Sequence, residues 1–133
     1  MRLTILIVAI MLSHLIFGIY MLNKNEKLDT SNFSVIEQIS KDRLKNELSE
    51  NPELQLVDVR KSNEWEKGNI SSALNIDYFQ KDFVAQFEHF DKEQPIYLYC
   101  RSGNRSRKGA RLLSQEGFSK IYDLQGGFLE WAK

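Results

Sequence analysis

The sequence predicts an α/β domain in which helices cover both faces of a parallel sheet, preceded by one N-terminal transmembrane or signal helix. Two observations carry this prediction. Short apolar segments alternate with helical patterns over residues 33–133, and residues 3–22 form one uncharged apolar run. Alternation of strands and helices is typical of parallel sheets, because a crossover must return the chain to the same end of the sheet. A chain of 133 residues has room for one such domain.

The expected elements of the domain are bounded by capping and turn residues. Ser40 can cap the first helix, and Asn51-Pro52 ends it because the residue before a proline disfavours the helical conformation. Gly68 and Gly117 stop the helical segments that precede them, and Gly126-Gly127 turns the chain into the last helix. In chain order we expect helix 41–48, strand 54–59, helical turn 64–67, strand 73–76, helix 79–90, strand 95–99, helix 106–115, strand 121–124 and helix 128–132.

The helix expected over 79–90 is the one with the clearest apolar stripe. Asp77 can cap it, and its four phenylalanines recur at spacings of four, four and three residues. Such a stripe is more typical of a core-facing helix than of a ligand pocket. The phenylalanines are Phe79, Phe83, Phe87 and Phe90.

The first apolar run is long enough to cross a bilayer. Residues 3–22 contain no charged side chain, and 20 helical residues reach about 30 Å, the thickness of the hydrocarbon core. We therefore expect a membrane anchor at 1–23, a polar linker at 24–32 and the domain at 33–133. The domain is expected on the extracytoplasmic side. The alternative is a cleaved signal peptide, with a secreted or periplasmic product.

Charge and cysteine count exclude several function classes. Basic and acidic residues are balanced at 18 each, which argues against nucleic-acid binding. The single cysteine, Cys100, excludes an intramolecular disulfide, a Cys-x-x-Cys redox pair and a multi-cysteine zinc site. His89 is the one histidine of the domain and has no partner at a ligand spacing, so we expect no metal and no cofactor.

Cys100 stands where a strand runs into a basic loop and then a helix. Residues 101–111 hold five basic residues and no acid. A lone cysteine at the end of a buried strand is commonly a small core residue, but this loop is a poor core neighbour. Helix-start N–H groups and arginines stabilise an anion, and Gly103 permits positive φ. The sequence thus predicts a reactive thiolate that faces a bound anion.

A second polar group follows another strand. Asp58 and Arg60 end the strand 54–59, and the carboxyl ends of parallel strands share one edge of the sheet, where ligands bind. We therefore expect Asp58 and Arg60 to lie near the Cys100 loop and support it. A simple surface pair or strand cap is the alternative for these two residues.

Several motifs occur together in the order of a known family. They are Asp58-Val59-Arg60, Glu64-Trp65, Gly68-x-Ile70, Ala73-x-Asn75-Ile76, the loop 99–106 and Leu124-x-Gly126-Gly127-Phe128-x-x-Trp131. The chain after Phe33 resembles a single-domain rhodanese, or sulfurtransferase homology domain. In that family the Gly-His-Ile element is usual, and here it is Gly68-Asn69-Ile70.

The resemblance implies that Cys100 takes a sulfane sulfur as a persulfide. The donor would be a small thiosulfate-like anion, and the acceptor a thiol, a protein thiol included, or cyanide. Arg105 is expected to organise the loop, and Arg101 to stand at the pocket rim. The residues implied are Cys100 as nucleophile; Arg101, Ser102, Gly103, Asn104 and Arg105 as the substrate cradle; and Asp58, Arg60 and Ser106 as supporting groups.

Two other classes remain to be weighed. Cysteine phosphatases use a Cys-x5-Arg loop, but four residues separate Cys100 from Arg105, and six separate it from Arg107. Neither spacing fits, and the smaller loop suits a sulfur atom better than a phosphate. The other class is a non-catalytic, membrane-tethered persulfide carrier or binding module. The cysteine loop alone does not distinguish such a carrier from a catalyst.

Overall fold

The computed structural model describes residues 11–19 and 34–133, in a chain that divides into the units Met1–Ser31 and Asn32–Lys133. In the first unit, residues 11–19 are helical. Within the two described ranges, no helix is both long and apolar enough to span a bilayer. More than half of the expected anchor 1–23 and all of the linker 24–32 lie outside the described residues, so both stay predictions.

The second unit is built on a five-stranded parallel sheet in the order β1-β5-β4-β2-β3. This confirms the predicted α/β class. The strands are β1 (Val35–Ile39), β2 (Gln55–Asp58), β3 (Leu74–Asn75), β4 (Ile96–Tyr99) and β5 (Lys120–Leu124).

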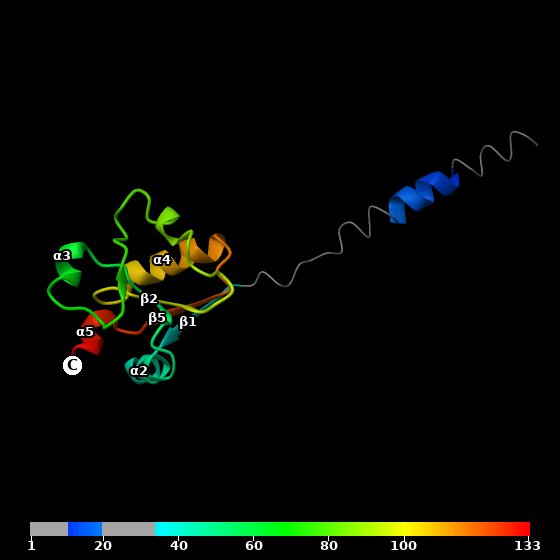
Figure 1. Cartoon of the computed structure of the whole chain (residues 1–133). Coiled ribbons are helices and arrows are strands. Elements are labelled where there is room, and N and C mark those ends of the chain that lie inside the picture. The colour runs from blue at the N-terminus through cyan, green and yellow to red at the C-terminus, as the bar shows by residue number, and fades with distance from the viewer. Residues whose placement is uncertain (1–10, 20–33) are drawn as a thin grey trace, which may run out of the picture. The chain divides into compact units, whose positions relative to one another are not determined.

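Helices lie on both faces of this sheet (Figure 1). On one face, α4 (Asn104–Gln115) and the short 3-10 helix η2 (Ala85–Phe87) cover the first core, which includes Leu98, Cys100 and Leu113. On the other face, α2 (Lys41–Glu50) and α5 (Gly127–Trp131) cover the second core, which includes Leu44 and Tyr99. Successive residues of a strand point to opposite faces, so Tyr99 and Cys100 belong to different cores.

The first helix forms where its capping signals predict. Ser40 is the N-cap of α2, and its hydroxyl accepts a hydrogen bond from the Arg43 N–H at 3.2 Å. At the other end, the Asn51 N–H donates to the Glu47 carbonyl, and Pro52 follows. Leu44 is fully buried. Local capping and one apolar face are therefore sufficient to set this helix.

β1 precedes the first helix, where no strand is predicted, so the prediction is wrong there. β1 pairs in parallel with β5 at the edge of the sheet, and only Ile39 of its five residues is buried. An edge strand that is exposed over most of its length lacks the continuous apolar pattern of an inner parallel strand. The pairing with β5, rather than local pattern, defines it.

The expected helix 79–90 is also wrong. The segment is a series of turns, and its one regular helical element is η2. Its backbone bonds run mainly three residues back, as from Phe90 to Phe87 and from Phe83 to Gln80. Phe83 and Phe87 are buried in the first core as expected, whereas Phe79 is 61% exposed. The phenylalanine spacing thus reflects core packing without a continuous helix.

Candidate active site at the Cys100 loop

Cys100 lies directly after β4, and three residues separate it from α4. Gly103 is the N-cap of α4 and has a φ of 107°, which confirms the predicted positive φ. Residues with a side chain rarely adopt this conformation. The glycine therefore lets the chain turn tightly around the sulfur before the helix begins.

The Cys100 sulfur accepts two hydrogen bonds from the helix start. The Gly103 N–H donates to Sγ at 3.1 Å, and the Ser106 hydroxyl donates to Sγ at 3.5 Å. Burial pulls the pKa of the Cys100 thiol upward, but the Ser106 hydroxyl and the N–H groups of Ser106, Gly103 and Ser102 outweigh it. The pKa therefore lies below its ordinary value. These donors stabilise a thiolate.

The loop presents two different sides. Gly103 and Ser106 are buried against the sulfur, whereas Arg101, Ser102 and Asn104 are exposed. The Arg101 guanidinium makes no ion pair within the described part of the chain. Cys100 itself is 1% exposed. A free cation thus stands outside a nearly enclosed thiol, an arrangement suited to a small anion.

Arg105 forms an ion pair with Glu64 of the same chain. Its two terminal nitrogens bind both Glu64 carboxylate oxygens, at 2.6 and 2.9 Å. This bidentate bond lowers the pKa of Glu64 to about 2, although burial opposes the shift. Glu64 lies in α3 (Ser62–Trp65), so the pair ties the cysteine loop to the segment after β2.

Asp58 and Arg60 form a buried ion pair, 0% and 3% exposed, so they are not a surface pair. Arg60 Nε donates to Asp58 Oδ2 at 2.9 Å, and a terminal nitrogen donates to the Gly68 carbonyl at 2.7 Å. The guanidinium lies 4.1 Å from the centre of the Phe128 ring. The pair thus faces the second core, on the side of the sheet opposite to the Cys100 side chain, and contacts the loop region through Phe128.

The Gly126-Gly127 pair does more than turn the chain. The Phe128 N–H donates to the Cys100 carbonyl at 2.8 Å, and the Leu129 N–H donates to the Arg101 carbonyl at 3.1 Å. A Cβ on Gly127 would overlap the Cys100 carbonyl oxygen. The start of α5 therefore holds the backbone of the Cys100 loop by hydrogen bonds. This contact was not predicted from the sequence, although the Gly-Gly-Phe motif was noted.

Asn69 stands where the family that this chain resembles usually has histidine, and its side chain has a structural role. Its side-chain amide donates to the Trp65 carbonyl at 3.2 Å. The next residue, Ile70, is buried, and its N–H donates to the Tyr99 hydroxyl at 3.0 Å. The substitution keeps a local hydrogen bond and introduces no charge.

Asp123 is a second residue that sequence reasoning missed. It lies within β5 and is 0% exposed, on the same face as Ile121 and hence in the first core beneath α4. Burial raises the pKa of its carboxyl, with the Ser106 hydroxyl, Gln38 and Arg107 opposing. An acid inside an apolar strand was the available signal.

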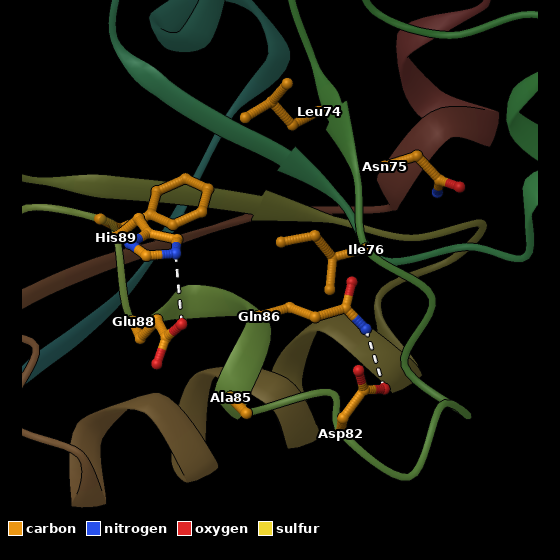
Figure 2. A pocket seen from close by; sticks show the side chains of 9 residues that line it. Leu74, Asn75, Ile76, Asp82, Ala85, Gln86, Glu88 and His89 are labelled. Carbon is orange, nitrogen blue, oxygen red and sulfur yellow. Dashed lines mark hydrogen bonds and ion pairs between the residues drawn. The ribbon is translucent and has the colours of Figure 1, made fainter.

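A separate hollow lies between β3 and the η2 segment (Figure 2). In it Gln86 donates to Asp82 at 3.1 Å, and His89 lies 3.2 Å from Glu88. Its lining includes none of the predicted site residues and no cysteine, serine or threonine. The Cys100 loop is therefore the candidate active site.

Known proteins resemble a large part of this chain. A putative sulfur carrier protein of Bacillus subtilis, YrkF, is 29% identical over 112 residues, which cover 84% of this chain and 60% of that protein. A sulfurtransferase of Allochromatium vinosum is 28% identical over 99 residues, covering 74% and 91%. The chain thus spans about three fifths of the first relative's length.

Solved structures and the family model agree with these relatives. The crystal structure of a rhodanese-like domain protein from Staphylococcus aureus superposes with a TM-score of 0.64 at 32% identity, covering 71% of this chain and 90% of that one. The sequence-family model of the rhodanese-like domain matches residues 40–133 of this chain. With the fold, the cysteine loop and this match in agreement, the chain belongs to the rhodanese-like family.

Proposed function

We propose that this protein is a sulfurtransferase that moves a sulfane sulfur from a thiosulfate-like anion to a thiophilic acceptor through a persulfide on Cys100. The observation that carries the proposal is the Cys100 sulfur, held 3.1 Å from the Gly103 N–H at the start of α4 with its pKa lowered. The names of the Allochromatium and Bacillus relatives support sulfur transfer in general terms.

The first step is attack of the Cys100 thiolate on the outer sulfur of the donor. A bond forms between Sγ and that sulfur, the sulfur–sulfur bond of thiosulfate breaks, and sulfite leaves with the electron pair. The product is a Cys100 persulfide anion. The N–H groups and the hydroxyl that stabilise the thiolate are placed to stabilise this anion too.

The second step needs an external acceptor. The chain has no second cysteine that could form an internal disulfide with Cys100. A thiolate or cyanide attacks the outer sulfur of the persulfide, the sulfur–sulfur bond breaks, and the electron pair returns to the Cys100 thiolate. Cyanide gives thiocyanate, and a thiol gives a new persulfide.

The two loop arginines are assigned different roles. Arg101 is exposed and makes no ion pair among the described residues, so it attracts the donor anion at the rim. Arg105 is committed to Glu64 at 2.6 Å and acts by fixing the loop. Ser102 and Asn104 border the entrance with their exposed side chains.

The test is thiocyanate formation by the full chain from thiosulfate and cyanide. We expect turnover by the wild type and none by Cys100→Ser, with one added sulfur on Cys100 in mass spectra after thiosulfate alone. The same samples should not hydrolyse an aryl phosphate. Equal thiocyanate formation by the wild type and the serine variant would refute the proposal.

A second candidate is a persulfide carrier with little turnover. The printed name of the Bacillus relative, a putative sulfur carrier protein, favours it. A carrier would acquire one sulfur on Cys100 and pass it once to a protein thiol, without sustained thiocyanate formation. Comparison of single loading with steady-state turnover separates the two candidates.

We also propose that residues 3–22 hold the protein in a membrane, with the domain on the extracytoplasmic side. The support is the length and lack of charge of this run. Protease added to cells with the outer barrier opened should digest the domain. Full protection of the domain until lysis would show that it lies on the cytoplasmic side. A soluble product beginning near Asn23 would show a cleaved signal peptide.

A further inference from the structure

Among the phenylalanine, tyrosine and tryptophan side chains of residues 34–133, Phe79 alone is exposed, with 61% of its surface open to solvent. Its backbone is held in place by hydrogen bonds. The Phe79 N–H donates to the Asp77 carboxylate at 2.9 Å, and the Tyr78 N–H donates to the Val59 carbonyl, just after β2, at 3.2 Å. One exposed apolar side chain needs no functional explanation by itself. What distinguishes Phe79 is its position.

The Phe79 ring borders the Cys100 loop. The ring centre lies 5.9 Å from the guanidinium carbon of Arg105, which is in the first turn of α4. The Lys61 ammonium lies 5.4 Å from the same ring centre, within the range of a cation–π contact. Lys61 is exposed and makes no ion pair with any residue in the described part of the chain. An exposed apolar ring and a lysine cation therefore stand together beside the nucleophile loop.

A hollow begins at this ring and extends along α4. Leu112 belongs to its wall, is 36% exposed and comes seven residues after Arg105, which places the two on the same helix face. Tyr78, Phe83 and Val84 add further apolar surface. The charged residues of the wall are Lys81, Asp82 and Glu116, so they give no excess of positive charge. We call this hollow the Phe79 groove: it is largely apolar along α4, and the cations Arg105 and Lys61 lie at its loop end.

The sulfur acceptor must reach a thiol that the loop almost encloses. Cys100 is 1% exposed, and a persulfide places its outer sulfur about 2 Å beyond Sγ. Cyanide is small enough to enter alone, whereas a cysteine of a protein brings its neighbouring residues against the loop rim. That rim is positive, since Arg101 and Lys61 are exposed and residues 101–111 contain no acid. Charge and shape complementarity thus favour an acceptor that carries an acidic and an apolar side chain next to its cysteine.

We propose that the Phe79 groove and Lys61 select the sulfur acceptor, and that this acceptor is a protein thiol flanked by an apolar and an acidic side chain. The apolar side chain contacts Phe79 in the groove, and the acidic one approaches Lys61. The acceptor thiolate then attacks the outer sulfur of the persulfide, the sulfur–sulfur bond breaks, and the electron pair returns to Cys100. The inference rests on the proposed function and deepens it, because it names the class of acceptor.

The experiment uses the full chain, loaded with one sulfur on Cys100 by thiosulfate and freed of excess donor. Short peptide thiols or cyanide are then added, and mass spectrometry follows the loss of the added sulfur from Cys100. The parent peptide has a cysteine flanked by leucine and glutamate. In a second peptide serine replaces the leucine, and in a third lysine replaces the glutamate. Every protein variant meets the same peptides, so differences in the intrinsic reactivity of the peptide thiols cancel.

The wild type should prefer the parent peptide to the serine peptide by about tenfold, the effect of one well-packed apolar contact. Phe79→Ala should lose most of this preference. Lys61→Gln should lose the preference for the parent over the lysine peptide, which should also weaken at high salt. Leu74→Ala is the matched control, because Leu74 is 57% exposed and lies in β3, outside the site. It should keep both preferences.

Two results would overturn the inference. The first is a Phe79→Ala variant that prefers the leucine-containing peptide as strongly as the wild type does. The second is an equal loss of preference in Leu74→Ala, which would show a general effect of exposed apolar surface. Transfer to cyanide separates this inference from the proposed function. Normal transfer to cyanide without any preference among the peptides would remove the acceptor site alone, whereas absent transfer to every acceptor would remove both.

Discussion

The Cys100 loop should depend on the absence of a side chain at Gly127, and Gly127→Ala tests this. Gly127 has a φ of 60°, and a Cβ there would overlap the Cys100 carbonyl oxygen and come within 2.8 Å of the Arg101 carbonyl oxygen. Both oxygens belong to backbone that Phe128 and Leu129 hold by hydrogen bonds. The overlap can be relieved only if α5 and the loop move apart.

The expected cost is the sum of three effects. An alanine in the left-handed region costs about 1–2 kcal/mol. Relief of the overlap costs about 1–3 kcal/mol, and each weakened backbone hydrogen bond about 1 kcal/mol. We expect Gly127→Ala to lower the free energy of unfolding by about 4–7 kcal/mol, a large share of the roughly 5–15 kcal/mol that stabilises a domain.

Gly117→Ala is the matched control for backbone strain. Gly117 also has a positive φ, 91°, but a Cβ there would have no neighbour within 4 Å. It should cost only the strain, about 1–2 kcal/mol. Urea unfolding of both variants measures the difference, and the pH dependence of alkylation shows whether the thiol pKa rises when the loop moves. Equal loss of stability in the two variants would refute the steric argument.

Three further predictions concern the charged groups. Arg60→Met leaves Asp58 buried without its cation and should cost about 3–5 kcal/mol in urea unfolding; a loss below 1 kcal/mol would contradict the role of the pair. Glu64→Gln should cost about 1 kcal/mol at neutral pH, since the pair with Arg105 is partly exposed. The pKa of Glu64 is lowered from 4.5 to about 2, so the stability that the ion pair contributes is complete above pH 4.5 and is lost as the pH falls toward 2. If Glu64→Gln loses stability over this window as steeply as the wild type, the pair does not cause the loss. Arg101→Ala should raise the KM for thiosulfate several-fold with little change in kcat, and less so at high salt; an unchanged KM would remove Arg101 from the donor site.

Elements marked by local signals were predictable from the sequence. Ser40 and Pro52 bound α2, and the inner strands β2 and β4 are short apolar runs. β1 was not predictable, because it is exposed at the edge and defined by its pairing with β5. The turns of 79–90 were not predicted because their local pattern is misleading. Phenylalanines at helical spacing also suit a series of three-residue turns packed on a core.

The same contrast applies to the site. Cys100, Gly103 and Ser106 lie within seven consecutive residues, so their contacts follow from one loop and one helix start. Asp58 and Arg60 were placed at the correct edge of the sheet, but the sequence did not say that they face the second core. Strand parity settles this only when the register between β2 and β4, which sets Asp58 opposite Tyr99, is known.

The groups that adjust the loop come from distant parts of the chain, and this explains why local pattern missed them. Phe128 donates a hydrogen bond to the Cys100 carbonyl from α5, and the absence of a side chain at Gly127 allows this close approach. Each acts only because β5 pairs with β4 in the observed register and α4 packs across that pair. The loop sequence therefore predicts that Cys100 is a thiolate site, whereas the backbone contacts that hold the loop in place come from α5, which only the tertiary structure brings to it.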